Sequence, residues 1–169
     1  MAPWHTRPET ASDREQIHRV NAAAFPTTAE AELVDALRAD PDAWIAGLST
    51  VATDDDGKVV AHALLSRCRV GGRPALVLGP CAVLPEHQRT GAGAAAIRAG
   101  LEAARELGEN LVTVLGHPDY YPRFGFVRAS EWGIAPGFDV PDEAMRVLSL
   151  DPTRPVPTGV IEYPPAFGV

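Results

Sequence analysis

The residues with the clearest chemical meaning form a glycine-rich turn between an apolar stretch and an alanine-rich stretch. The apolar stretch, residues 76–84, is interrupted by a Gly-Pro pair, and the turn then reads Q-R-T-G-A-G from Gln88 to Gly93. Backbone N–H groups at the start of a helix lack partners and lie at the positive end of its dipole. Because glycine lets a diphosphate approach the backbone closely, a strand, this turn and a helix in that order predict an anion site.

Two widespread phosphate-binding motifs do not describe this turn. A P-loop requires a lysine after its glycines, and the only lysine of the chain, Lys58, lies elsewhere. A Rossmann fingerprint requires three glycines and an acidic residue on the second strand, which this segment does not supply. The turn instead resembles the Q/R-x-x-G-x-G/A motif of the GNAT superfamily of N-acetyltransferases, with Gln88 as its first residue and Gly93 as its last.

Two further segments extend the resemblance. Residues 79–85, G-P-C-A-V-L-P, are similar to the fourth strand of the family, and residues 121–126, Y-P-R-F-G-F, are similar to its Y-x-x-x-G-F motif. Gln88 and Tyr121 are separated much as the two family motifs are. The resemblance implies the GNAT fold, of class α/β (α+β), as a single domain over residues 1–169. That fold has a mixed, mostly antiparallel central sheet, a splayed parallel strand pair and helices on both faces.

The resemblance also implies how acetyl-CoA binds. In the family the fourth strand bulges and splays from its parallel neighbour, and its free backbone groups pair with the pantetheine arm. Pro80 agrees with such a bulge because proline removes a donor from the strand ladder. The groups that would pair with pantetheine belong to Cys81, Ala82 and Val83. The residues that would hold the pyrophosphate are Gln88, Arg89, Thr90, Gly91, Ala92, Gly93 and Ala94. At Thr90 the family often has Arg or Lys, so one charge contact is missing here.

Acetyl transfer to an amine makes three chemical demands. The amine must be neutral to attack, the tetrahedral oxyanion needs hydrogen-bond donors, and the leaving thiolate needs a proton. Free backbone N–H groups near Ala82 and Val83 could serve the oxyanion. The family uses a tyrosine as the acid, which the resemblance assigns to Tyr121, with the adjacent Tyr120 as second candidate. The competing interpretation of Tyr121 is an aromatic side chain that only packs.

The sequence does not identify the general base that would take the proton from the amine. His117 and Asp119 follow the end of a predicted strand, whereas Glu86 and His87 precede the glycine-rich turn. Each is also explained as an ordinary polar loop residue. Ordered water could then take the proton from the amine.

The two cysteines, Cys68 and Cys81, are too few for a disulfide framework. If a two-residue hairpin forms at 71–72, Cys68 lies opposite Ala75 and Cys81 lies opposite His62, and the thiols are too far apart to bond. A Cys–His pair would allow a covalent acetyl-cysteine route. That route is disfavoured, because a small buried cysteine beside a strand histidine usually belongs to the core.

Composition limits the classes of partner. The chain has 169 residues, 46% of them hydrophobic, and a formal net charge of −7. The negative charge and scattered arginines argue against nucleic acid, and weakly favour cationic substrates such as amines. No apolar run is long enough for a membrane span, and the polar start does not resemble a signal peptide. We therefore expect a reduced, cytoplasmic protein, for which a homodimer is a possible assembly.

No metal site is expected. The aspartates at 54–56 precede Gly57 and read as the tip of a hairpin, since they lack the ligand spacing of a calcium loop. Acetyl-CoA is thus the only cofactor that the sequence implies.

Periodicity and turn residues place these motifs on alternating elements. Helices are predicted over residues 13–24, 29–38 and 93–107, the first with capping-box spacing from Ser12 to Glu15. Strands are predicted over residues 4–7, 44–53, 58–69, 75–84, 111–115, 126–129, 144–150 and 159–163. A right-handed crossover makes 111–115 parallel to 75–84.

The helix over 29–38 carries three acidic residues, Glu30, Glu32 and Asp35. The resemblance places this helix on the acceptor side of the cleft. A solvated helix face is the favoured interpretation of these acids.

Two functions from different classes follow. The first is an acetyl-CoA-dependent N-acetyltransferase in which a primary amine, on a small molecule or a protein, attacks acetyl-CoA directly. The alternative is a non-catalytic GNAT-fold module that binds or senses CoA. Tyr121 and the uninterrupted pyrophosphate turn favour the enzyme.

Overall fold

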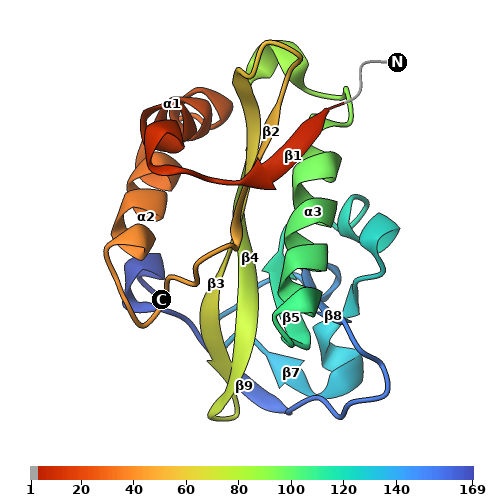
Figure 1. Cartoon of the computed structure of the whole chain (residues 1–169). Helices are drawn as coiled ribbons and strands as arrows, with labels where there is room; N and C mark the ends of the chain where they lie inside the picture. The colour runs from red at the N-terminus through yellow and green to blue at the C-terminus, as the bar shows by residue number, and fades with distance from the viewer. Residues whose placement is uncertain (1–3) are drawn as a thin grey trace.

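The computed structural model describes residues 4–169 as a mixed sheet with helices on both of its faces (Figure 1). The start of the chain, on which the expectation about a signal peptide rests, lies partly outside the described residues. The strand order is β1-β2-β3-β4-β5-β8-β6, and β9 pairs with β3 and β7. Most neighbours are antiparallel, whereas β4 and β5 are parallel. The predicted fold class is therefore confirmed.

The element bounds agree closely with the predicted ones. The helices are α1 (Arg14–Ala24), α2 (Ala29–Arg38) and α3 (Ala92–Glu106). The strands are β1 (His5–Pro8), β2 (Ser49–Thr53), β3 (Val59–Val70), β4 (Arg73–Val83), β5 (Leu111–Leu115), β6 (Val127–Arg128), β7 (Ile134–Ala135), β8 (Met145–Ser149) and β9 (Gly159–Glu162). The predictions for 29–38 and 111–115 are confirmed at both ends, and β7 was not predicted.

Two predicted starts were wrong. The strand expected over 44–53 begins only at Ser49, because the backbone turns at 45–48, where the Leu48 N–H donates to the Ile45 carbonyl at 3.2 Å. The capping box expected from Ser12 is made two residues earlier. There the Asp13 carboxylate accepts the Thr10 backbone N–H at 2.7 Å.

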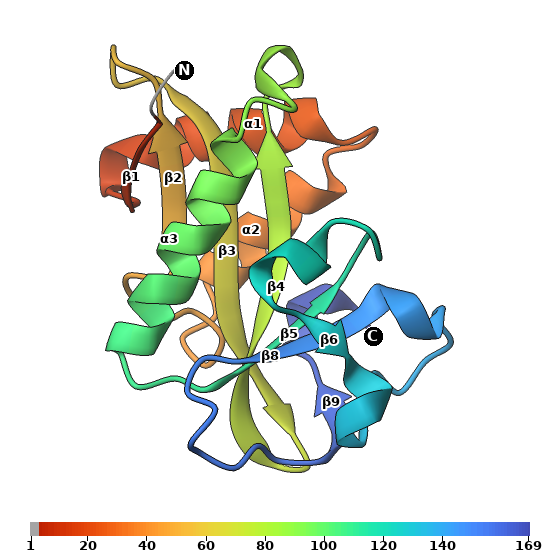
Figure 2. The same ribbon diagram turned by 90° about the vertical axis from the view of Figure 1, so that its right-hand side faces the viewer.

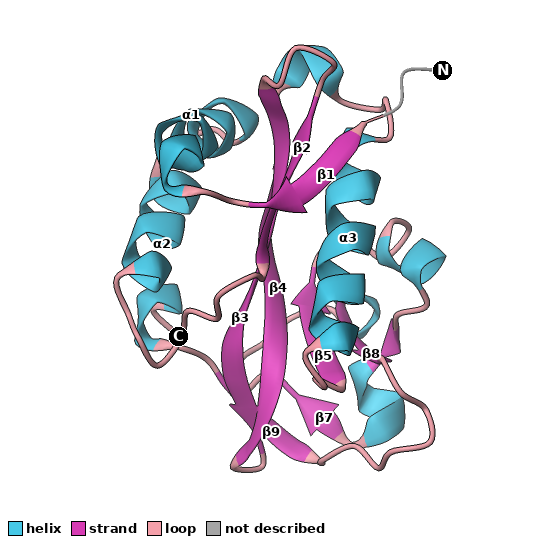
Figure 3. Cartoon of the chain, in the orientation of Figure 1, coloured by secondary structure: helices cyan, strands magenta, loops and turns pink. Residues whose placement is uncertain are grey.

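Helices α1 and α2 cover one face of the sheet and α3 covers the other (Figures 1 and 3). Because both faces are covered, β3 is buried along most of its length and reads as an almost continuous apolar run. The contact of α3 with the sheet is close. A Cβ added at Gly100 would lie 3.4 Å from Thr50 Oγ1 and 3.6 Å from Leu65 Cδ1.

A bulge interrupts the pairing of β3 with β4. Leu65 pairs with Leu78, whereas Ala63 pairs with Cys81, so one residue of β3 lies opposite residues 79–80 of β4. Two residues of β4, Gly79 and Pro80, thus occupy the place of one, and the proline can donate no ladder hydrogen bond. The register therefore shifts where the resemblance implied a bulge.

The bulge changes the register expected for the cysteines. Cys68 pairs with Ala75, which confirms the prediction from the hairpin. Cys81 pairs with Ala63, so the prediction that it lies opposite His62 was wrong by one residue. Counting from the turn assumes an unbroken ladder, and the bulge adds one residue to β4 alone. Both thiols are free.

The parallel pair β4–β5 separates immediately before the bulge. Pairing runs from Leu76 opposite Val112 to Leu78 opposite Val114, while β4 continues to Val83. Figure 2 shows β4 extending past β5 beside α3. Backbone groups on that side of β4, from residue 79 onward, thus lack the strand partner that residues 76–78 have.

Residues 4–169 include no helix whose length and apolar character would suit a bilayer. In the same part of the chain, no three His, Cys, Asp or Glu side chains are grouped as metal ligands. The aspartate-rich hairpin tip is explained by its own turn. Asp54 Oδ1 accepts the backbone N–H groups of Asp56 and Lys58 at 3.0 and 2.9 Å.

An ion pair fastens β1 to the start of α1. Arg7 donates to both carboxylate oxygens of Asp13, at 2.5 and 3.0 Å, and the Asp13 side chain is only 4% exposed. Hydrogen bonding to Arg7 lowers the pKa of Asp13 to about 2. A lowered folded-state pKa stabilises the fold above the unfolded value, about 3.9, and that stabilisation is lost as pH falls through the folded value.

We predict that Asp13→Ala lowers the free energy of unfolding at pH 7 by about 1–3 kcal/mol, since a charged hydrogen bond is lost. The difference from the wild type should shrink between about pH 4 and about pH 2. Urea unfolding at pH 7 and pH 3 measures both. Asp55→Ala is the control, because Asp55 pairs with His5 at an exposed site and should cost under about 1 kcal/mol. An equal loss at both pH values for Asp13→Ala would contradict the pairing.

Candidate active site

The turn before α3 leaves backbone donors free. Gly91 is the N-cap residue in the left-handed conformation, with φ of 89°, and Arg89 also has positive φ, 64°. The first donor satisfied at this end is the Ala95 N–H, which bonds to the Gly91 carbonyl at 3.0 Å. Within the described residues, the N–H groups of 92–94 have no backbone acceptor. Together with the helix dipole they form a site for an anion.

This turn is held against β4 and the start of the chain. The Gln88 amide donates to the Val83 carbonyl at 3.4 Å, and Trp4 Nε1 donates to the Thr90 carbonyl at 3.0 Å. Helix α3 approaches β4 so closely that position 93 requires glycine. A Cβ there would lie 2.8 Å from Val83 Cγ2.

A pocket of about 1080 Å³ connects the turn with the splayed strands and α2. Of the residues predicted to bind the cofactor or catalyse transfer, those that line it are Cys81, Val83, Gln88, Arg89, Gly91, Gly93, Ala94 and Tyr121. Ala82 and Ala92 have buried side chains. Thr90 is exposed outside the pocket, and its hydroxyl donates to the His87 carbonyl. Most of the predicted set is therefore gathered in one place.

Tyr121 lies at the splay, after β5. A Cβ at Gly116 would overlap the Tyr121 ring, so this glycine makes room for the ring. Burial, and then the neighbouring Cys81, raise the pKa of the Tyr121 hydroxyl well above its ordinary value. The phenol is thus protonated at neutral pH, as a proton donor must be.

Tyr120 also lines the pocket, nearer to α3. Its hydroxyl lies 3.8 Å from the position of a Cβ on Gly93, and the Arg123 guanidinium stacks on its ring at 4.3 Å. The two tyrosine rings meet edge to face, with centroids 5.1 Å apart. Burial raises the pKa of Tyr120 as well. The adjacent tyrosines therefore occupy different parts of the same pocket.

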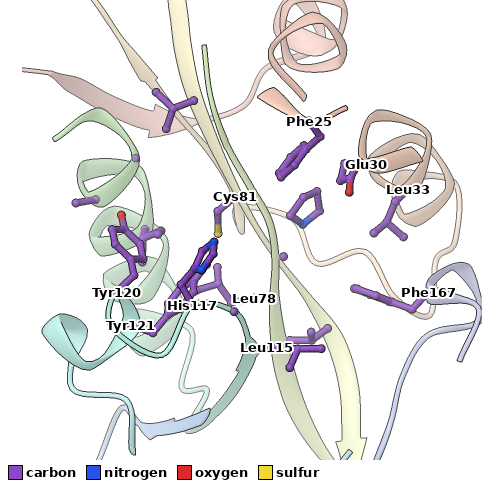
Figure 4. A pocket seen from close by; sticks show the side chains of 18 of the residues that line it. Phe25, Glu30, Leu33, Leu78, Cys81, Leu115, His117, Tyr120, Tyr121 and Phe167 are labelled. Carbon is purple, nitrogen blue, oxygen red and sulfur yellow. The ribbon is translucent and has the colours of Figure 1, made fainter. Parts of the chain in front are cut away.

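The candidates for the general base separate in the structure. His117 lines the pocket and lies near Cys81 and the tyrosines in Figure 4. Asp119, Glu86 and His87 are absent from the lining, and His87 packs edge-on against Trp4. Only one of the four candidates thus lies where it could accept a proton.

The Cys–His pair of the covalent route does not form. Burial raises the pKa of Cys81 to about 12, which hydrogen bonding to Tyr121 only partly offsets, so the group is a thiol at neutral pH. His62 is buried between Ser49 and Asn21, whose side chains lie 2.8 and 3.1 Å from its ring nitrogens. Burial, and then Arg38, lower the pKa of His62 to about 3. Neither residue has the partner or protonation state of a nucleophile–base pair.

The opposite end of the pocket holds residues that the sequence did not assign. In Figure 4, Phe25, Glu30 and Leu33 lie across β4 from the tyrosines, with Phe167 from the C-terminal segment beside them. Glu30 was predicted to lie on a solvated face. The signal that indicated otherwise is its three-residue spacing from Leu33, which places both on one side of α2.

Comparison with known proteins agrees with this geometry. The family model described as "Acetyltransferase (GNAT) family" matches residues 14–126. The chain is 40% identical over 137 residues to YjhQ of Escherichia coli K12, an "uncharacterized N-acetyltransferase", covering 78% of this chain and 75% of that protein.

Solved structures extend the similarity to the whole fold. The crystal structure of the GNAT family N-acetyltransferase YhbS from Escherichia coli, in complex with CoA, has a TM-score of 0.91 and 29% identity, covering 100% of this chain and 94% of that one. A GNAT family acetyltransferase from Brucella melitensis, in complex with acetyl-CoA, has a TM-score of 0.79 and 32% identity, covering 99% of each chain. The family match, the relatives and the splayed β4–β5 pair agree, and the chain belongs to the GNAT family of acetyltransferases.

Proposed function

We propose that this chain transfers the acetyl group of acetyl-CoA directly to a primary amine within a ternary complex. The observation that carries the proposal is one continuous pocket joining the free N–H groups of α3 to a protonated tyrosine at the splay. The anion site suits a pyrophosphate, and the tyrosine suits a leaving thiolate. Structures of similar proteins with CoA and acetyl-CoA support the donor.

Acetyl-CoA would lie across both parts of the pocket. Gln88 and the backbone from Arg89 to Ala94 would hold the pyrophosphate. The pantetheine would run along the free edge of β4, beside the backbone of residues 81–83. Arg89 would add the positive charge that the turn lacks at Thr90, since it lines the pocket.

Transfer then needs one attack and two proton movements. The amine nitrogen attacks the thioester carbonyl carbon, the N–C bond forms and the C–S bond breaks. The Tyr121 hydroxyl donates a proton to the sulfur, and the nitrogen gives up a proton to His117 or to water. Backbone N–H groups near Val83 would donate to the oxyanion. The products are the acetamide and CoA.

We predict that Gly91→Val abolishes the rise in melting temperature caused by acetyl-CoA, because valine disfavours the left-handed conformation on which the free N–H groups depend. Scanning calorimetry with and without acetyl-CoA measures the shift. Gly57→Val is the matched control. Gly57 also has positive φ, 82°, but lies on a hairpin tip outside the pocket. A full acetyl-CoA shift in Gly91→Val would rule out the pyrophosphate site.

We predict that Tyr121→Phe lowers turnover by roughly ten- to a thousand-fold, since general acid catalysis is typically worth ~10²–10⁴-fold and a thiolate is a fair leaving group. The phenyl ring still packs against Gly116, so the melting temperature and acetyl-CoA affinity should change little. Thiol release at saturating acetyl-CoA measures turnover. Tyr120→Phe, the adjacent control, should lose much less. Loss in Tyr120→Phe with none in Tyr121→Phe would move the acid to Tyr120.

We predict that Cys81→Ala keeps most of the activity and that no acetyl group remains on the enzyme, because the thiol is not ionised. Intact-mass spectrometry after mixing with acetyl-CoA alone tests for an adduct. A stable acetyl adduct that disappears in Cys81→Ala would instead establish the covalent route.

A further inference from the structure

The pocket contains one carboxylate side chain without a partner. Among the described residues that line it, Glu30 is the only Asp or Glu. Its Oε1 atom is buried and has no hydrogen-bond partner within residues 4–169. A buried carboxylate oxygen without a donor loses its hydration and gains nothing in return. The unpaired oxygen therefore points to a ligand that donates a hydrogen bond, preferably a cation.

Neighbouring acids are already used or face solvent. Asp35 lies 2.9 Å from His18 Nδ1 and accepts from Arg38 at 3.3 Å. Glu32, two residues after Glu30 on α2, is exposed and does not line the pocket. The free carboxylate is thus specific to Glu30.

The charges of the pocket are divided between its ends. Its basic side chains are Arg89 in the turn before α3, Arg123 after β5, and His117. They lie on the elements that would hold the anionic cofactor. Glu30 comes from α2, on the other side of β4 (Figure 4). An ammonium group would therefore be attracted to the Glu30 end and repelled from the cofactor end.

Apolar side chains surround this carboxylate. Phe25, Leu33 and Phe167 lie at the same end of the pocket (Figure 4). The Tyr163 ring packs against Phe167 with centroids 5.6 Å apart, and Phe138 packs against Tyr163 at 5.8 Å. A ligand that places one cation at Glu30 would bury its remaining atoms among aromatic and aliphatic groups. A second cation on the ligand would meet no further acidic side chain of the lining.

We propose that Glu30 binds the ammonium group of the acceptor, and that the acceptor is a primary monoamine with an apolar aliphatic or aromatic body. The inference rests on the proposed amine acetylation and specifies its substrate class. Glu30 selects the cationic amine as it enters the pocket. The amine then gives one proton to water, leaves Glu30 as the neutral species and attacks the thioester.

Glu30 also lies in the first turn of α2, where a negative charge stabilises any helix. Glu32 occupies the same turn. Glu32→Gln therefore removes an equivalent charge from the helix end without touching the pocket, and is the matched control for this structural role.

The test is calorimetric titration of the CoA-saturated protein at pH 7 with 2-phenylethylamine, which is cationic, and with 2-phenylethanol, its neutral analogue. We expect Glu30→Gln to weaken 2-phenylethylamine binding by about 10- to 100-fold, the value of a charged hydrogen bond, and to leave 2-phenylethanol unchanged. Glu32→Gln should bind both as the wild type does. Glu30→Asp, which keeps the charge, should retain part of the preference for the amine.

Equal binding of 2-phenylethylamine to Glu30→Gln and the wild type would overturn the proposal, as would no binding to the wild type. If Glu30→Gln does not fold, a Glu30→Asp protein that folds but has no preference for the amine would also overturn it. Thiol release is measured separately on the wild type. An amine that binds through Glu30 without releasing CoA would contradict the acetylation and leave the binding site standing.

Discussion

The structure depends on the bulge at residues 79–80 of β4. Pairing with β5 stops at Leu78, immediately before the pair Gly79-Pro80, whose proline cannot donate to a ladder. The same extra residue shifts the register with β3, so Cys81 lies opposite Ala63. The bulge thus coincides with the point where the β4 edge loses its partner β5. It also determines which β4 residues lie beside the gap between the two strands.

The second constraint is the close contact of α3 with the sheet. A Cβ at Gly93 would lie only 2.8 Å from Val83 Cγ2, whereas one at Gly100 would lie 3.4 Å from Thr50 Oγ1, at the limit of ordinary contact. The start of α3 is fixed by Gly91 in the left-handed conformation, and the N–H groups of 92–94 find no backbone acceptor within residues 4–169. The anion site at the start of α3 and the free edge of β4 therefore lie together where α3 packs against the sheet.

Protonation in the pocket follows from desolvation. Burial raises the pKa values of both Tyr121 and Cys81, which keeps the phenol and the thiol neutral. A neutral phenol at the splay could donate a proton, whereas an un-ionised thiol is a poor nucleophile. The charged side chains of the pocket lie at its two ends. The basic ones are beside the turn before α3, and Glu30 is on the other side of β4. This division suits an anionic acetyl donor and a cationic acceptor that come together beside the neutral side chains of Tyr121 and Cys81.

The sequence by itself determined the features that depend on short-range order. The glycine-rich turn, the bulge, the bounds of α2 and β5 and the position of Tyr121 after β5 follow from local patterns of glycine, proline and apolar residues. The tertiary structure alone decided which separate segments meet. It placed His117 in the pocket and left Asp119 outside, and it turned Glu30 toward an apolar cavity completed by the C-terminal segment. Such contacts depend on long-range packing, on which the local spacing of residues carries no information.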